Sequence, residues 1–300
     1  MRLKRWAGLC AGGLLCLSAA VQAHDVQQFE HVTSLRLTLR SDLRQREVIV
    51  LKPDAQTAGR APAIVMLHYL HGSPADMADL TAAGRLARDA GAWVILPDAV
   101  QGKWNYGSAS VKTVDDVKFL DTVIDAVAER FPIDTRRLYM SGYSNGGLMA
   151  VRYACERPER VAAVGVVATT IEQLDALRCA PAQGVAMLYI NGVDDPIVPF
   201  EGNLLKRSAD STLALWRGFN DCTDTSTSEQ LPDRVDDATR VTHKAWRDCS
   251  SGLPVEQYRI EGGGHTWPGT QRYTLGLGIT SQDLEATEAI WQFVSRYSRP

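Results

Sequence analysis

A serine between glycines, where a strand changes to a helix, is the first feature of this sequence that could do chemistry. Residues 142–146, GYSNG, match the pattern G-x-S-x-G. Residues 138–140 before it favour a strand, and residues 147–150 after it favour a helix. In such a turn the glycines let the backbone pass closely, and the serine hydroxyl is lifted clear of the sheet. The pattern predicts Ser144 as a nucleophile; the alternative is a structural serine in a glycine-rich helix N-cap.

A serine hydroxyl is a weak nucleophile, so it needs a histidine to take its proton. The chain has only six histidines, and His265 follows three glycines, residues 262–264, that come after an expected strand. Glycines permit a tight loop that reaches over a sheet edge. We therefore predict His265 as the base, with a surface-loop histidine as the alternative.

The base in turn needs a carboxylate that orients its ring. Asp194 and Asp195 end the apolar run 185–193 and precede Pro196. This places both at the carboxyl edge of a sheet, where sites of α/β proteins assemble. The pattern alone leaves both aspartates open as the acid.

Attack on a carbonyl also needs donors for the developing oxyanion. The backbone N–H of Asn145, directly after the serine, is one candidate. The second is expected after the apolar run 63–67, with Tyr69 as the choice. Trp104 and Trp267 are candidates for the walls of a substrate pocket, although tryptophans also pack in cores.

The spacing of His68 and His71 would allow both side chains to bind one metal ion. A protein zinc site takes three or four side-chain ligands. No third ligand with suitable placement is evident in the sequence, so we predict no metal site.

The elements that must position these residues alternate along the chain. Two stretches alternate apolar and polar residues, as antiparallel strands do, and five apolar runs are typical of buried parallel strands. The alternating stretches are 34–40 and 46–53, and the apolar runs are 63–70, 92–100, 137–144, 161–169 and 185–193. Helix-period segments such as 114–131 lie between the runs. This predicts an α/β fold with a mostly parallel sheet, antiparallel N-terminal strands and helices on both faces.

Two further elements are expected in the last hundred residues. The segment 203–254 contains a helix-like stretch, 208–220, and then a polar loop, which we expect to pass over the active-site edge of the sheet. A final helix is expected to begin near Thr280, whose spacing to Asp283 resembles a capping box. No repeat or linker is visible, so residues 24–300 are expected to form a single domain.

The first 23 residues predict a secretory signal peptide. Basic residues precede a short apolar stretch, and small residues end it at Ala23. Cleavage there predicts a secreted or periplasmic protein, and leucines before Cys10 and Cys16 argue against a lipid anchor. Loss of three basic residues shifts the formal charge from −3 to −6, which disfavours nucleic-acid binding. No apolar run beyond the leader is long enough for a membrane anchor.

Four cysteines remain after this cleavage, in a chain bound for an oxidising compartment. An even number there favours two disulfides. Of the three possible pairings we favour neighbours in sequence, Cys155 with Cys179 and Cys222 with Cys249. Buried free thiols are the alternative.

Together these motifs resemble the secreted polyhydroxybutyrate depolymerase and feruloyl esterase family. The resemblance runs from about residue 61 to residue 297. It rests on six segments: GKWN at 102–105, VDDVKFLDTVID at 114–125, GYSNGGLM at 142–149, NGVDDPIVPF at 191–200, EGGGHTWPG at 261–269 and SQDLEATEAIWQF at 281–293.

The resemblance implies an α/β-hydrolase domain that cleaves carboxylic esters through an acyl-enzyme, without metal or organic cofactor. It implies Ser144 as nucleophile, His265 as base and Asp195 as acid, and it supports the pairing of Cys222 with Cys249. The family usually has His-Gly where this chain has His68-Tyr69.

The function expected from the sequence is therefore secreted ester hydrolysis. The substrates would be feruloyl or acetyl esters of polysaccharides, or hydroxyalkanoate esters of the polyhydroxybutyrate type, as small esters or polymer fragments. Two alternatives remain: a serine peptidase on the same fold, and a non-catalytic binding descendant of it.

Overall fold

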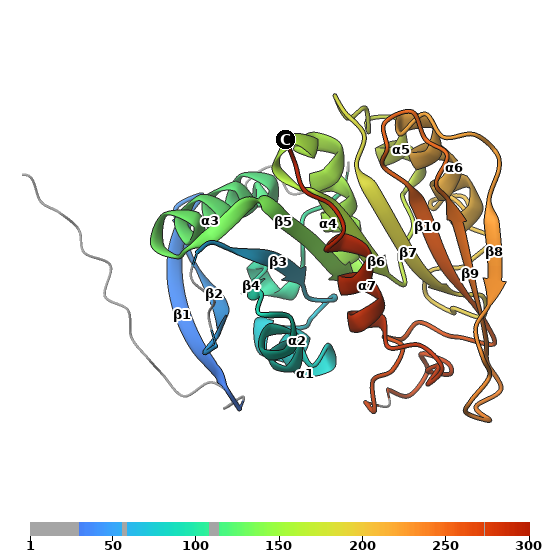
Figure 1. The fold of residues 1–300 in the computed structure, drawn as a ribbon, viewed down its shortest axis with the longest axis horizontal. Helices are drawn as coiled ribbons and strands as arrows, with labels where there is room; N and C mark the ends of the chain where they lie inside the picture. Colours follow the sequence, from blue (N-terminus) through green and yellow to red (C-terminus); the bar gives the residue numbers. More distant parts are fainter. Residues whose placement is uncertain (1–29, 56–58, 108–113, 273) are drawn as a thin grey trace, which may run out of the picture.

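A ten-stranded sheet forms the centre of the molecule (Figure 1). The computed structural model describes residues 30–55, 59–107, 114–272 and 274–300, so the predicted signal peptide lies outside the described residues. The strands are β1 (Val32–Ser41), β2 (Arg44–Pro53), β3 (Ala61–Leu67), β4 (Trp93–Pro97), β5 (Ile133–Tyr143), β6 (Ala163–Val167), β7 (Ala186–Gly192), β8 (Thr227–Gln230), β9 (Arg240–Trp246) and β10 (Val255–Glu261). Their order in the sheet is β1-β2-β4-β3-β5-β6-β7-β10-β9-β8.

The six central strands, from β4 to β10 in the sheet order, are parallel, and two antiparallel strands flank them on each side. Every residue of β4, β6 and β7 is buried, as expected for strands covered on both faces. The alternating stretches form β1 and β2, which pair antiparallel. The predicted mostly parallel sheet with antiparallel N-terminal strands is confirmed.

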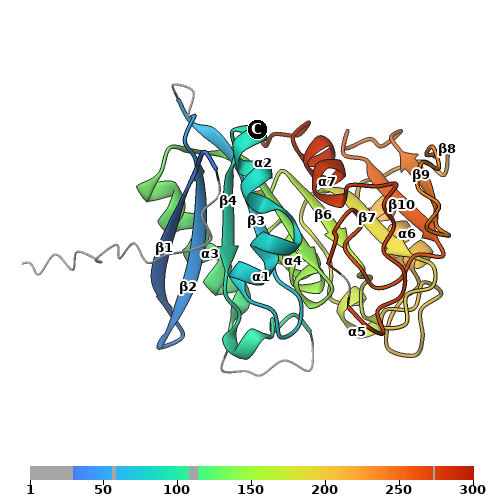
Figure 2. The ribbon, with the colours of Figure 1, turned by 90° about the horizontal axis from the view of Figure 1, so that it is seen from below.

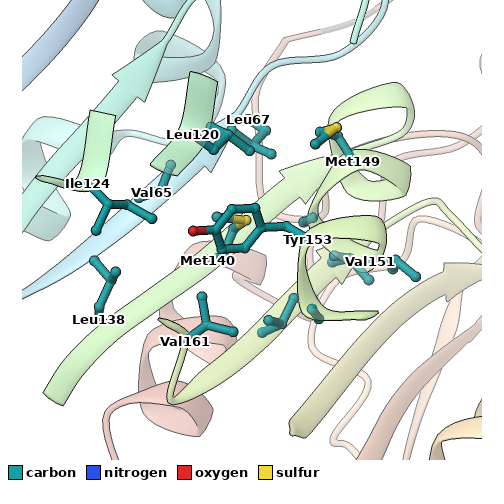
Figure 3. Packing of buried hydrophobic residues seen from close by; sticks show 14 of the residues in the cluster. Val65, Leu67, Leu120, Ile124, Leu138, Met140, Met149, Val151, Tyr153 and Val161 are labelled. Atoms are coloured by element: carbon teal, nitrogen blue, oxygen red, sulfur yellow. The ribbon is translucent and has the colours of Figure 1, made fainter. Parts of the chain in front are cut away.

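Helices cover both faces of the sheet (Figures 1 and 2). The helices are α1 (Pro74–Leu80), α2 (Ala83–Ala90), α3 (Asp116–Arg130), α4 (Asn145–Glu156), α5 (Gln173–Ala176), α6 (Ala209–Phe219) and α7 (Ala286–Val294), with 3₁₀ turns at Val100–Gly102 and Pro158–Arg160. One apolar cluster joins α1, α2 and α7 to the sheet, and the other joins α3, α4 and α6 to it. Figure 3 shows the second cluster, in which Met140 of β5 and Tyr153 of α4 are both fully buried. Within the described ranges, no helix has the length and apolar content of a membrane span.

Two expectations about the last third of the chain were wrong. The final helix begins at Ala286 and not near Thr280. The Asp283 carboxylate accepts from the N–H groups of Arg234 and Val235, so it fixes a loop instead of capping a helix. The segment 203–254 contains α6 as expected, but the supposed polar loop contributes β8 and β9 to the sheet. It widens the sheet sideways because β9 pairs along the whole of β10.

Two disulfides tie surface segments to this framework. Cys155 is bonded to Cys179, and Cys222 is bonded to Cys249. These are the pairings favoured from the sequence. The first joins the end of α4 to the segment after α5, and the second joins the segment after α6 to the segment after β9.

A buried ion pair joins β2 to the start of α3. Arg46 Nη1 donates to Asp116 Oδ1 at 2.5 Å, and the two side chains are 4% and 0% exposed. The guanidinium of Arg46 also lies over the Phe119 ring, 3.5 Å from its centroid. Asp116 Oδ2 accepts from the N–H of Asn105 at 2.7 Å. The pair therefore fixes both the helix and the loop that carries the GKWN segment.

Replacing Asp116 by Ala is expected to leave the charge of Arg46 buried without its carboxylate. Removal of one partner of a buried pair costs about 3–5 kcal/mol, so the free energy of unfolding in urea should fall by that amount. Asp125→Ala is the matched control on the same helix, because its pair with Arg160 lies at the surface and should contribute at most about 1 kcal/mol. Equal effects of the two substitutions would contradict this account.

Candidate active site

Ser144 occupies a sharp turn between β5 and α4. Its φ of 53° and ψ of −115° lie in a region that residues with side chains rarely adopt. Its N–H donates to the Val167 carbonyl at 3.0 Å, and its carbonyl accepts from the Leu148 N–H at 2.9 Å. The strained backbone is thus held from both sides, and the serine side chain stays partly exposed at the carboxyl edge of the sheet.

The glycines of the motif are required by close backbone contacts. A Cβ atom on Gly142 would lie 2.3 Å from the Gly146 carbonyl oxygen. A Cβ atom on Gly146 would lie 2.2 Å from the carbonyl oxygen of Leu67 and 2.5 Å from that of His68. Because all three distances are far below van der Waals contact, only glycines let the start of α4 approach the ends of β5 and β3 this closely.

The structure brings Ser144, His265 and Asp195 into one hydrogen-bonded row. His265 Nε2 lies 2.8 Å from Ser144 Oγ, and His265 Nδ1 lies 2.7 Å from Asp195 Oδ2. An ionised carboxylate can only accept, so Nδ1 carries the proton and Nε2 is left to accept from the serine hydroxyl. This is the arrangement in which an imidazole can remove the proton of an attacking hydroxyl.

Asp195 and Asp194 have different environments. The side chain of Asp195 is 2% exposed, and its Oδ1 accepts from the N–H groups of Ile197 and Val198 at 2.8 and 2.7 Å. Asp194 is exposed, and its backbone N–H donates to the Gly263 carbonyl at 2.9 Å. Only Asp195 contacts the imidazole, so the geometry favours Asp195 as the partner of His265.

The loop that carries His265 is anchored along its backbone. The N–H of Gly264 donates to Ile279 at 2.9 Å, and the N–H of His265 donates to Leu277 at 2.6 Å. The carbonyl of His265 accepts from the Tyr143 hydroxyl at 2.5 Å. Three glycines alone would leave this loop flexible, so these bonds fix the direction of the imidazole.

A cleft of about 610 Å³ opens beside Ser144 and His265. Much of its lining is apolar or aromatic, and Arg272 is the positive charge among its lining residues. The residues that line it beyond the expected ones include Leu70, Leu80, Ile197, Arg272 and Leu277. No lining residue comes from 203–254, so the expectation that this segment covers the active-site edge is not met.

Of the two tryptophans expected to line the substrate pocket, one lines the cleft and the other does not. Trp267 lines the cleft, although it is only 2% exposed, and its indole N–H donates to Thr287 at 3.1 Å. Trp104 is fully buried and does not line the cleft, so its assignment to substrate binding was wrong. Its indole N–H donates to the His68 carbonyl at 2.9 Å, and its backbone N–H donates to Asn145 Oδ1 at 2.8 Å. Trp104 therefore ties the end of β3 to the start of α4.

The two backbone N–H groups expected to bind an oxyanion lie on the segments that Trp104 joins. Asn145 is the first residue of α4, where an N–H has no acceptor within the helix. Tyr69 is the second residue after β3 and lines the cleft. The contact between Gly146 and residues 67 and 68 brings these segments together.

His68 is a structural residue beneath this region. It is fully buried, its Nε2 accepts from the Ala99 N–H at 3.0 Å, and its Nδ1 therefore donates to the Tyr69 carbonyl at 2.8 Å. Both ring nitrogens are occupied, so the ring is not free to bind a metal. A search of the described residues finds no group of three or more His, Cys, Asp or Glu side chains that could hold a metal ion.

Sequence reasoning missed two residues that support the site. The motif assigns no role to Tyr143, yet its hydroxyl holds the His265 backbone. Asp116 lies in the first turn of α3, directly after the N-cap Asp115, and its carboxylate pairs with the buried Arg46. The signal for Asp116 was its spacing of four residues from Leu120 on the buried stripe of α3.

The chain is similar in sequence to proteins that are named as esterases. It is 27% identical over 236 residues to feruloyl esterase B of Piromyces equi, covering 73% of this chain and 42% of that protein. It is 28% identical over 258 residues to "Putative esterase NocK" of Nocardia uniformis subsp. tsuyamanensis, covering 78% of this chain and 74% of that protein. The chain is thus similar to a feruloyl esterase and to a putative esterase, each at less than 30% identity.

The fold of this chain agrees with that of a solved structure. The acetyl xylan esterase from Aspergillus awamori superposes with a TM-score of 0.61 at 15% identity, covering 78% of this chain and 94% of that one. The chain therefore has the α/β-hydrolase fold predicted from its motifs. No model of a known protein family matches it.

Replacing Gly146 by Ala is expected to push α4 away from β3. The clash with the Leu67 carbonyl should lower the free energy of unfolding by about 1–3 kcal/mol, the range for overpacking. A displacement of 1 Å at a reacting group costs about 100-fold in rate. The reaction of Ser144 with a fluorophosphonate, followed by mass spectrometry, should slow by that order.

Gly218→Ala is the control for this substitution. Gly218 lies in α6, and a Cβ atom there would meet nothing within 4 Å. The control should be neutral or stabilise by up to about 1 kcal/mol, because Ala favours helices over Gly. If the two variants behaved alike, the close contact at Gly146 would not be the reason for its glycine.

Proposed function

We propose that this protein is a serine carboxylic ester hydrolase in which Ser144 attacks the ester carbonyl. The observation that carries the proposal is the row Ser144 Oγ, His265 and Asp195, with distances of 2.8 and 2.7 Å. His265 Nε2 takes the serine proton as the C–O bond forms, and the same proton then passes to the departing alcohol. Water, activated by His265, releases the acid from Ser144 in the second half of the reaction.

The oxyanion of each tetrahedral intermediate is proposed to accept from the backbone N–H groups of Asn145 and Tyr69. The first lies at the positive end of α4, which favours a developing negative charge. The second lies on the segment that His68 and Trp104 hold from below. No group from a cofactor is needed for either step.

The proposed substrates are esters with an apolar or aromatic part. The names of the relatives point to feruloyl esters, and that of the superposed structure points to acetyl groups on xylan. Hydroxyalkanoate esters are a third class expected from the motifs. A cleft of about 610 Å³ with an aromatic lining has room for an acyl group larger than acetate.

The proposed place of action is outside the cytoplasm, in a periplasm or beyond the cell. The two disulfides fit an oxidising compartment. The predicted cleavage after Ala23 would release the chain into it.

Ser144→Ala and Asp195→Asn test the mechanism on p-nitrophenyl acetate. The first removes the nucleophile and should abolish acyl-enzyme turnover. The second leaves a group that no longer holds the imidazole in its required tautomer, and kcat should fall about 10⁴-fold, as in other triads. Asp194→Asn is the matched control, because Asp194 is exposed, and it should keep wild-type kcat. A Ser144→Ala variant with full activity would refute the nucleophile.

A substrate panel tests the specificity. Methyl ferulate, acetylated xylan and hydroxybutyrate oligomers would be compared by kcat/KM, with casein as the peptidase control. We expect hydrolysis of at least one ester class and none of casein. Cleavage of casein without any ester hydrolysis would overturn the esterase in favour of a peptidase.

A further inference from the structure

Tyr143 is a buried side chain in contact with three parts of the site. It is the last residue of β5, directly before the nucleophile, and only 5% of it is exposed. Its ring lies 5.3 Å from the imidazole of His265 at an interplanar angle of 32°. It also meets Tyr69 edge-on at 5.5 Å and Trp267 edge-on at 6.1 Å.

The Tyr143 hydroxyl has one clear use. It donates to the backbone carbonyl of His265 at 2.5 Å. Burial, and then the nearby charge of Asp195, raise the pKa of Tyr143 above its usual range, so the hydroxyl stays protonated and remains a donor. Because this proton points to a backbone carbonyl, it is not available to an oxyanion or a leaving group.

The His265 backbone, which accepts this hydrogen bond, sets the direction of the imidazole. Residues 262–264 are glycines, and His265 follows them. The N–H of His265 is fixed by Leu277 and its carbonyl by Tyr143, so the peptide groups on both sides of the imidazole are held. Without the hydroxyl, the carbonyl would be buried and unpaired, and the following peptide could rotate toward another donor.

We propose that Tyr143 is a positioning residue that aligns His265 between Ser144 and Asp195 through this hydrogen bond and ring contact. The proposal rests on the proposed function of the same site. It assigns to the second residue of the G-x-S-x-G segment a task distinct from that of the glycines. The nucleophile strand thereby holds its own base in place.

Tyr143→Phe tests this proposal because it keeps the ring and removes only the hydroxyl. With p-nitrophenyl acetate, kcat should fall about 10- to 100-fold, the range for a small misplacement of a reacting group, while KM stays near the wild-type value. The low-field NMR resonance of the His265 Nδ1 proton should broaden or move upfield, since the imidazole no longer holds one orientation against Asp195.

Tyr139→Phe is the matched control. Tyr139 is a fully buried tyrosine on the same strand, and its hydroxyl also donates to a backbone carbonyl, that of Tyr297, at 3.0 Å. Tyr139→Phe also removes a hydroxyl that donates to a backbone carbonyl, but not one bonded to His265. The kcat and the low-field resonance should therefore stay as in the wild type. If Tyr143→Phe and Tyr139→Phe had equal kinetics and spectra, the positioning role would be wrong.

A double variant separates positioning from direct contact with the substrate. The rate of Ser144 phosphonylation by a fluorophosphonate would be measured in His265→Ala with and without Tyr143→Phe. If Tyr143 acts through His265, the second substitution adds nothing once the imidazole is gone. A further loss of rate in the double variant would overturn the proposal.

These readouts also distinguish this proposal from the proposed function. If the wild type reacted with the fluorophosphonate but hydrolysed no ester, the ester function would fail, and the phosphonylation rates and NMR spectra would still test Tyr143. If the wild type hydrolysed esters and Tyr143→Phe kept its full kcat, only the role of Tyr143 would fail.

Discussion

The positive φ of Ser144 is the constraint on which the arrangement of the site depends. A serine does not adopt this backbone without support, so the surroundings must hold it. Val167 and Leu148 do this through backbone hydrogen bonds, and Gly142 and Gly146 leave room for the close approach of strand and helix. The same packing sets the hydroxyl at the carboxyl edge of the sheet and the first N–H of α4 beside it.

A buried polar network beneath the site connects the segments around Ser144 to β2 and α3. Arg46 on β2 pairs with Asp116 on α3, and Asp116 accepts from Asn105. The residue before it in this loop, Trp104, donates to the His68 carbonyl and to the side-chain oxygen of Asn145, the first residue of α4. Each polar group has a partner, which is the condition for a buried network to stabilise a single arrangement.

The fold and the meeting of Ser144 with His265 were predictable because their signals are local. Apolar runs marked the parallel strands, and the glycine pattern marked the turn at Ser144. The buried roles of Trp104 and Asp116 could not be predicted, because they depend on which distant segments of the chain meet. Arg46 illustrates this difference. It lies on the same buried face of β2 as Val48 and Val50, as the two-residue spacing predicts, but its partner Asp116 is evident only from the tertiary structure. Within 203–254, β8 was missed because its residues are polar and exposed at the edge of the sheet, and β9 was missed because only three of its seven residues are buried.

The most direct measurement is the identification of the covalent intermediate. The enzyme would be mixed with p-nitrophenyl acetate, quenched in acid within the first turnover and digested, and the acylated peptide would be sequenced by mass spectrometry. The account predicts one acetyl group on the peptide that contains Ser144, attached to that side chain. Rapid release of p-nitrophenol with no acyl group on Ser144, or with the acyl group on another residue, would contradict it.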